Sequence, residues 1–189
     1  LDFEKRAKDK NAEVDSTVAD AILKEMNKNS NAIYQAGYAV SLGMMKFKDA
    51  GDQLLDNLER VKNQEEAAGY YSVALGLMGF REAVDTINDI VDRSTRRDKL
   101  LTQGSIALGL LGDKEISQKL VRRMESKGTV AVMSALAQAL GFIGDRNSIQ
   151  PLVDILGNKS FKDLPRAFAA VALGLVGDKE ELPWNSKIS

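Results

Sequence analysis

A Leu-Gly dipeptide recurs along the chain at a nearly constant interval. Its glycines, which we call the ladder glycines, are separated by 33, 33, 32 and 33 residues. They are Gly43, Gly76, Gly109, Gly141 and Gly174. A fixed period of about 20 to 50 residues is typical of stacked-repeat architectures, in which each unit buries its apolar side against its neighbours. The spacing therefore predicts an elongated repeat fold rather than a fold built around one central core.

Each repeat reads as two helices joined by a short turn. In the third repeat, the residues before Gly109 are mostly small or aliphatic, and Gly112 and Asp113 follow them. A glycine at this place lets the chain leave a helix through a positive φ, and the Asp side chain caps the next helix or ties down the turn. Apolar residues then recur at helical spacing. They are Ile116, Leu120, Val121 and Met124. We call the first helix of each pair helix A and the second helix B.

The first two turns depart from this plan. Lys46 stands where the later repeats have their second glycine, and Phe47 and Phe80 stand where they have Asp. We therefore expect the first turn to be built differently from the others. We expect Phe47 and Phe80 to pack on each other between repeats rather than to stack on a ligand.

The composition agrees with a helical fold. Hydrophobic residues make up 44% of the chain, aromatic residues only 6%, and three of the 189 residues are proline. Small and aliphatic side chains suit closely packed helices, and a low proline content allows long helical segments. We therefore predict an all-α fold, an α-α superhelix or solenoid of about 4.5–5 helix pairs with a period of about 33 residues.

We expect one domain over residues 1–189, which ends in an incomplete repeat. The segments are an N-terminal cap-helix region (1–30), four repeats (31–63, 64–95, 96–127 and 128–159) and an incomplete last repeat (160–189). Terminal repeats need a polar outer face, and Phe168, Val171 and Leu175 in the last A helix do not provide one. We therefore favour a chain that is part of a longer protein, with Trp184 folding back as a cap as the alternative. Association through the uncovered last repeat is a further expectation.

The chain has neither cysteine nor histidine. These absences remove the thiol nucleophile, the imidazole general base and the commonest zinc ligands. We therefore expect no catalytic activity, no cofactor and no metal site. A net charge of −1 gives no global positive field for nucleic acid, and no apolar run approaches the ~18–20 residues that span a bilayer. The charged start does not read as a signal peptide, which leaves the localisation open and favours the cytoplasm.

The unit Ala-Leu-Gly-x-x-Gly-Asp, followed by a short amphipathic helix, resembles the HEAT-like repeats first named in phycobilisome lyases. The resemblance covers about residues 15–182 and is closest at 107–124, 139–156 and 172–183. It implies a right-handed α-α superhelix whose B helices line the inner, concave side. Proteins with this fold have unrelated functions, so the resemblance does not imply one activity.

Two positions of each B helix fall between its buried ones and are expected to face the concave side. They hold Asp56 and Asn57, Asp89 and Ile90, Arg122 and Arg123, and Asp154 and Ile155. We take these positions, except Asn57, together with Lys119 as the candidate partner-binding residues. Exposed apolar side chains on a concave face favour binding, and we expect Ile90 and Ile155 to be such side chains.

Neighbouring repeats carry opposite charge. Residues 64–95 hold six acidic and two basic residues, whereas residues 96–127 hold eight basic and four acidic ones. The favoured interpretation is that these blocks form ion pairs between repeats, for example Asp89 or Asp92 with Arg122 or Arg123. Exposed pairs of this kind contribute only about 0–1 kcal/mol each. The alternative is that Lys119 and the two arginines receive an acidic peptide or a phosphate through bidentate contacts.

The main functional prediction is a non-catalytic scaffold module that binds a protein or peptide on its concave face. One alternative is an accessory subunit of a phycobilin-lyase-type enzyme. Another is a weak nucleic-acid binder that uses the basic patch of the third repeat, although the near-neutral net charge argues against it. The sequence does not identify the partner.

Overall fold

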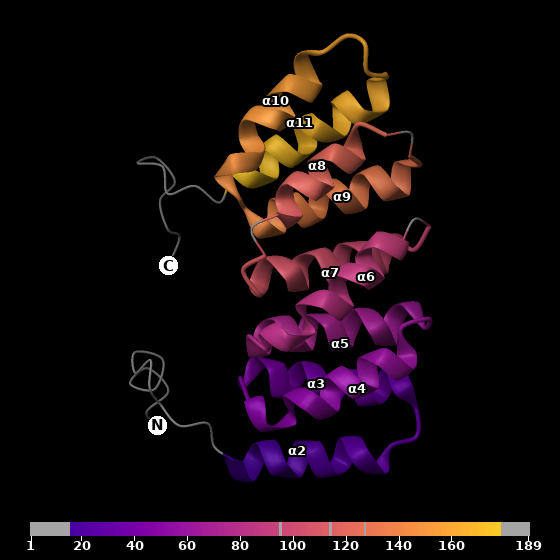
Figure 1. Cartoon of the computed structure of the whole chain (residues 1–189), viewed down its shortest axis with the longest axis vertical. Coiled ribbons are helices and arrows are strands. Elements are labelled where there is room, and N and C mark those ends of the chain that lie inside the picture. Colours follow the sequence, from indigo (N-terminus) through magenta and orange to yellow (C-terminus); the bar gives the residue numbers. More distant parts are fainter. Residues whose placement is uncertain (1–15, 95, 114, 127, 179–189) are drawn as a thin grey trace.

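A computed structural model describes residues 16–94, 96–113, 115–126 and 128–178. In these residues the chain forms ten α-helices and three short 3-10 helices, without a β-strand (Figure 1). The α-helices are α2 (Ser16–Lys28), α3 (Ala32–Met44), α4 (Gly51–Val61), α5 (Glu65–Met78), α6 (Val84–Arg93), α7 (Asp98–Leu110), α8 (Ile116–Met124), α9 (Val130–Ile143), α10 (Ile149–Gly157) and α11 (Asp163–Gly177). The 3-10 helices η1 (Lys48–Ala50), η2 (Arg81–Ala83) and η3 (Arg146–Ser148) precede α4, α6 and α10. The predicted all-α solenoid is confirmed.

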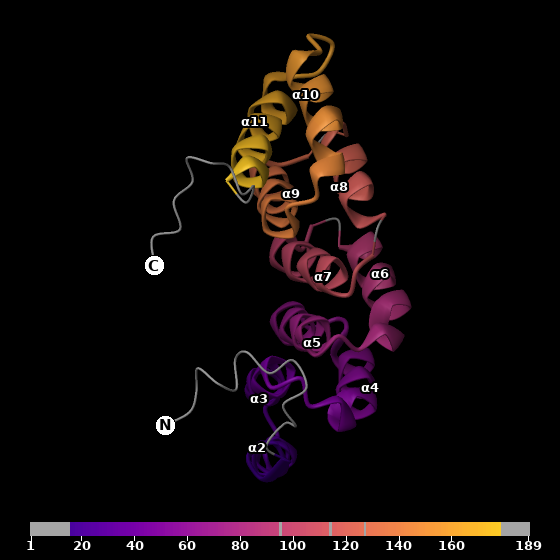
Figure 2. The ribbon, with the colours of Figure 1, turned by 90° about the vertical axis from the view of Figure 1, so that its left-hand side faces the viewer.

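The helices form two layers along the long axis of the molecule (Figure 2). The A layer consists of α3, α5, α7, α9 and α11, and the B layer of α4, α6, α8 and α10. Each B helix packs mainly against the A helix that follows it in the sequence, so that successive repeats interlock. The core is therefore continuous from one end of the described chain to the other.

The ladder glycines lie inside the A helices and let these helices approach one another. A Cβ atom on Gly43 would lie 2.4 Å from the carbonyl oxygen of Ala74 on the next A helix, and one on Gly76 would lie 2.9 Å from the Cα of Ala107. Real Cβ atoms do not come so close to backbone atoms, so any larger residue would force the helices apart. The Leu-Gly period therefore records helix-to-helix packing, and the turn itself depends on a different residue.

The turns after the first four A helices all use a left-handed residue. Gly79, Gly112 and Gly144 have φ values of 72°, 75° and 66°, and Lys46 has a φ of 56°. The expectation that the first turn is built differently is therefore wrong for the backbone. Lys46 adopts the same conformation at a steric cost that glycine does not have.

Local contacts complete these turns. Asp113 Oδ1 accepts a hydrogen bond from the backbone N–H of Glu115 at 2.9 Å, so the predicted role of this Asp in tying down the turn is confirmed. In the turns that lack Asp, Phe47 is buried and the ring of Phe80 lies over Gly51 at the start of α4. Aromatic packing thus takes the place of the Asp contact.

We expect Lys46→Gly to raise the free energy of unfolding by about 1 kcal/mol, because it removes the cost of a left-handed lysine. Urea unfolding followed by circular dichroism measures the change. The reverse substitution one repeat later, Gly79→Lys, is the matched control and is expected to lower the free energy of unfolding by about the same amount. A loss of stability in Lys46→Gly would contradict this account.

The A layer lines the inner side of the curved molecule, and the B layer lies on the outer, convex side (Figure 2). Neighbouring A helices pack on one another directly, whereas neighbouring B helices make few backbone contacts in the described residues. The expectation that the B helices line the concave side is therefore wrong. Ala and Gly bring the A helices close together, and the layer with the smaller helix spacing takes the shorter arc.

The two ends of the described solenoid differ. At the N-terminal end, α2 lies in the predicted cap-helix region and packs against α3 as a B helix packs against the next A helix. Its exposed residues include Asp20, Lys24, Glu25 and Lys28, which give this end a polar outer face. At the other end, α11 is the last described helix. The predicted role of Trp184 lies outside the described residues.

Candidate partner-binding surface

Two of the predicted basic residues of the third repeat hold α8 against α6. Lys119 Nζ lies 3.0 Å from Asp92 Oδ1 and donates a 3.1 Å hydrogen bond to Asn88 Oδ1. Arg123 donates to the backbone carbonyls of Val91 at 3.1 Å and Ser94 at 2.8 Å, at the C-terminal end of α6. These contacts join neighbouring repeats, so neither side chain is positioned as a free receptor for an anion.

The surroundings of Arg123 agree with a structural role. Burial lowers the pKa of its guanidinium, and the nearby Asp92 carboxylate opposes this shift. A cation at a helix C-terminus interacts favourably with the helix dipole. Arg97 makes a similar contact at the end of α4, where it donates to the carbonyl of Lys62 at 3.2 Å.

Pairing between the charged blocks is confirmed, but the basic partner differs from the two arginines named as examples. Asp92 pairs with Lys119, as described above, and Asp89 pairs with Arg93 on its own helix at 2.8 Å. The contacts between the B helices are thus partly ionic and partly hydrogen bonds to backbone carbonyls. Arg122 is exposed on α8.

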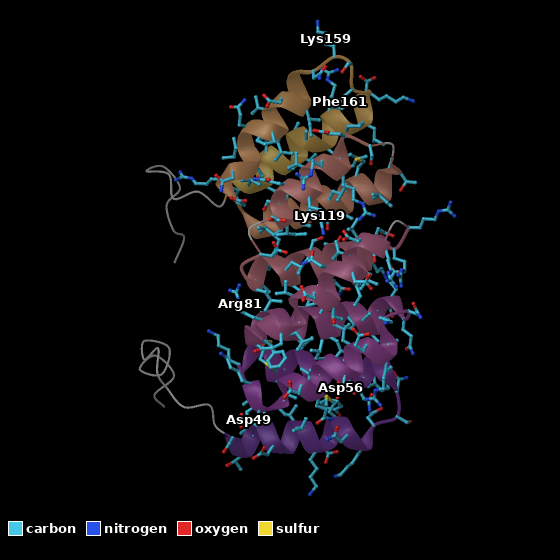
Figure 3. All side chains as sticks on the ribbon, viewed as in Figure 1. Asp49, Asp56, Arg81, Lys119, Lys159 and Phe161 are labelled. Atoms are coloured by element: carbon cyan, nitrogen blue, oxygen red, sulfur yellow. The ribbon has the colours of Figure 1, made fainter. Side chains whose placement is uncertain are left out.

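The remaining predicted residues are not gathered into one concave site. Ile90 is only 3% exposed and Ile155 only 1%, so the expectation that they face solvent is wrong. They lie on the side of the B helices that packs into the core. Asp56 and Asp154 are exposed, on the convex B layer (Figure 3 labels Asp56 and Lys119). Asp154 accepts a hydrogen bond from Gln150 of the same helix at 2.9 Å.

The concave side is formed instead by the exposed face of the A helices. The residue that follows the ladder glycine is apolar in all five A helices and is exposed in four of them. This set, which we call the apolar row, is Met44, Leu77, Leu110, Phe142 and Leu175. Met44 is 71% exposed, and Leu77 is the half-buried member.

A second set of residues lies one helical turn before the apolar row, on the same face. Its members are Val40, Val73, Ile106, Gln138 and Val171. Four of the five are β-branched and apolar, and all of them are at least partly exposed. The two sets together form an apolar band that crosses five successive A helices.

A small polar hollow lies beside this band, between α7 and α9. Its lining combines hydroxyl, amide and charged groups with two alanines. The lining residues are Asp98, Lys99, Thr102, Gln103, Ala131, Ser134, Ala135 and Gln138. The Oε1 atom of Gln103 is buried without a hydrogen-bond partner, as is the hydroxyl of Ser105 nearby on α7. The A-helix surface thus combines an extended apolar band with polar groups at its side.

The sequence contains a pattern that could have predicted this A-helix surface. All five residues after the ladder glycines are apolar, but a residue in an apolar A helix reads first as core. In the described parts of the chain, no cluster of three or more His, Cys, Asp or Glu side chains could hold a metal ion, and no helix is long and apolar enough to cross a membrane. The arrangement is suited to binding apolar side chains.

No protein-family model matches the sequence, and no curated protein matches it either.

Proposed function

We propose that this protein is a non-catalytic scaffold module that binds a protein or peptide partner on the concave surface of its A helices. One observation carries the proposal: five successive A helices place an apolar residue at the same position of the same face. The class of function is the one predicted from the sequence, and the proposed binding surface lies on the A helices instead of the B helices.

The recurrence of these residues distinguishes them from ordinary surface residues. Single exposed apolar side chains are common on proteins and need no explanation. A contiguous exposed apolar patch, in contrast, marks an interaction site. The apolar row continues through all five A helices, and Ile33 and Tyr34 on α3 and Tyr70 on α5 add exposed apolar surface to the same layer.

Catalysis and nucleic-acid binding receive less support. The chain lacks cysteine and histidine, and the apolar band carries no titratable group. The nucleic-acid alternative needs the basic residues of the third repeat, but Lys119 and Arg123 bind α6. No specific residue favours the phycobilin-lyase alternative. The resemblance of the repeat unit to HEAT-like repeats agrees with a binding module.

Peptide selection tests the proposal. We expect a phage-displayed peptide library to yield ligands of the wild-type protein, and Leu110→Glu to raise the Kd of a selected peptide by tenfold or more, because it places a charge in the apolar row. Fluorescence anisotropy of the labelled peptide measures the Kd.

Val18→Glu is the matched control for this experiment. Val18 is exposed to a similar extent as Leu110 but lies on α2, outside the A layer. We expect Val18→Glu to leave the Kd unchanged and circular dichroism to show that both variants are folded. The proposal fails if no peptide is enriched, or if the two variants weaken binding equally.

A further inference from the structure

The polar hollow between α7 and α9 is the place where the A-helix surface departs from its apolar pattern. Its volume of about 300 Å³ lies at the lower end of the range of ligand pockets, about 300 to 1,000 Å³, so it has room for one side chain rather than for a large cofactor. Gln138 lines the hollow and is also the one polar member of the apolar band. A ligand that lies on the band therefore reaches the hollow without leaving the surface.

The hollow exists because α9 carries alanine at two positions where other A helices carry larger side chains. Ala131 and Ala135 stand ten and six residues before the ladder glycine of this helix. Alanine leaves free the space that a larger side chain would fill. The opening is thus a property of this pair of repeats rather than of the repeat plan. The same two positions hold Glu66 and Tyr70 in α5 and Leu164 and Phe168 in α11.

Two side chains around the hollow donate hydrogen bonds within the protein and keep acceptor groups for a ligand. Gln138 Nε2 donates to Ser134 Oγ at 2.9 Å, and Thr102 Oγ1 donates to the backbone carbonyl of Asp98 at 2.9 Å. An amide that donates through its nitrogen keeps its carbonyl oxygen, and a hydroxyl that donates its proton keeps its lone pairs. Gln138 and Thr102 can therefore accept hydrogen bonds from a ligand that carries N–H groups.

The carboxylate of Asp98 gives the hollow its charge. Asp98 is half-buried, and no cation of the described residues lies within ion-pair distance of its carboxylate. The neighbouring Lys99 is exposed, and its Nζ lies 3.5 Å from Glu66 Oε1 on α5. Two carboxylates and one ammonium group leave one net negative charge here, which favours a cation over an anion in the hollow.

The helix N-termini beside the hollow do not turn it into an anion site. Helix N-termini attract anions through their unpaired N–H groups and the helix dipole. Asp98 is itself the first residue of α7, where its negative charge balances the dipole. At the start of α9, Thr129 Oγ1 accepts a hydrogen bond from the N–H of Val132 at 3.2 Å. The chain thus supplies its own acceptors to both N-termini.

We propose that the polar hollow binds a lysine or arginine side chain of the peptide ligand, whose charge pairs with Asp98 and whose N–H groups donate to Gln138 Oε1 and Thr102 Oγ1. The inference rests on the proposed function, since this side chain belongs to the peptide that lies along the apolar band. The apolar residues of the peptide then give contact area, and its cation fixes the register in which the peptide binds.

Peptides selected on the wild-type protein test the proposal. We expect the enriched sequences to share a Lys or Arg at a fixed distance from their apolar residues. Asp98→Asn is expected to raise the Kd of such a peptide at least fivefold, because it removes the charge and keeps the shape of the side chain. Replacing the shared Lys or Arg of the peptide by Gln is expected to weaken binding to the wild type equally, with little further loss on Asp98→Asn.

Asp163→Asn is the matched control. Asp163 is the first residue of α11, as Asp98 is of α7, and both stand eleven residues before a ladder glycine. Both substitutions remove a charge from a helix N-terminus, but Asp98 lines the hollow and Asp163 does not. We expect Asp163→Asn to leave the Kd unchanged. Equal effects of the two variants, or enriched peptides without a shared basic residue, overturn this proposal, whereas the proposed function still stands if Leu110→Glu weakens binding.

A small probe tests the hollow without a peptide. We expect N-acetyl-arginine amide at millimolar concentration to shift the backbone amide NMR signals of Thr102, Ser134 and Gln138 in the wild-type protein but not in Asp98→Asn. N-acetyl-glutamate amide is the control and is expected to leave these signals in place. If the glutamate derivative shifts them, or the arginine derivative does not, the hollow is not a cation site. Either result overturns the proposal, whatever the outcome of the peptide selection.

Discussion

Gly43→Ala is expected to lower the free energy of unfolding by about 3 kcal/mol, although alanine is normally the better helix former. The added Cβ would lie 2.4 Å from the carbonyl oxygen of Ala74 and 2.9 Å from its Cα. Both are backbone atoms of α5, which cannot turn aside as a flexible side chain does. The substitution therefore has to push α3 away from α5, and it opens the contact between these two helices to relieve the clash.

Gly37→Ala is the matched control, because Gly37 lies in the same helix and a Cβ there would meet no atom within 4 Å. We expect this variant to raise the free energy of unfolding by up to about 1 kcal/mol through helix propensity alone. Urea unfolding followed by circular dichroism compares the two. Equal effects of the two substitutions would show that the ladder glycine has no role in packing.

Amide hydrogen exchange adds a second test of the same substitution. In a solenoid each repeat contacts only its neighbours, so damage at one interface stays local. We expect Gly43→Ala to accelerate exchange in α2, α3 and α4 and to leave α9 and α11 unchanged. Uniform acceleration along the chain would show that the molecule unfolds as one cooperative unit.

Arg123→Met is expected to lower the free energy of unfolding by about 2 to 3 kcal/mol. Methionine preserves much of the side-chain volume but donates no hydrogen bond, so the carbonyls of Val91 and Ser94 lose their contacts from Arg123. Hydrogen bonds from charged groups contribute more than neutral ones, and an acceptor left in a part-buried site has a desolvation cost. Thermal and urea unfolding measure the loss.

Arg122→Met is the control at the adjacent position. Arg122 is exposed, and its replacement is expected to change the free energy of unfolding by no more than about 0.5 kcal/mol. This pair separates the structural role of Arg123 from a general effect of positive charge on α8. If both variants were equally stable, Arg123 would not hold the repeats together.

The repeat fold could be predicted from the sequence because the packing that creates the period uses specific residues. A glycine is required wherever two A helices approach closely, as at Gly43 and Gly76, and a left-handed residue is required at each turn. The ladder glycines recur once per repeat and therefore appear as a spacing, although a Cβ atom on Gly109 or Gly141 would meet only side chains of the next A helix. The conformation of the first turn could not be predicted in this way, because Lys46 adopts the left-handed conformation there without a glycine to mark it in the sequence.

The candidate site could not be predicted in the same way. The direction of curvature depends on the relative spacing of the two layers, and that spacing results from side-chain volumes summed over both. An A helix is apolar on several sides, so Leu110 reads as core although it is exposed. Conversely, Ile90 and Ile155 lie beside charged residues in the sequence and read as surface, although they point into the core.

The arginine contacts at the ends of α4 and α6 have a consequence for the behaviour of the molecule at different ionic strengths. Their acceptors are backbone carbonyls in part-buried positions, which carry no formal charge. Dissolved ions weaken exposed pairs such as Lys62 with Glu59, but they act less on part-buried hydrogen bonds to uncharged acceptors. These arginine contacts between repeats therefore persist in concentrated salt, whereas the exposed pair of Lys119 with Asp92 weakens. If salt releases a bound partner, it does so by acting on the partner's own contacts, while the solenoid keeps its form.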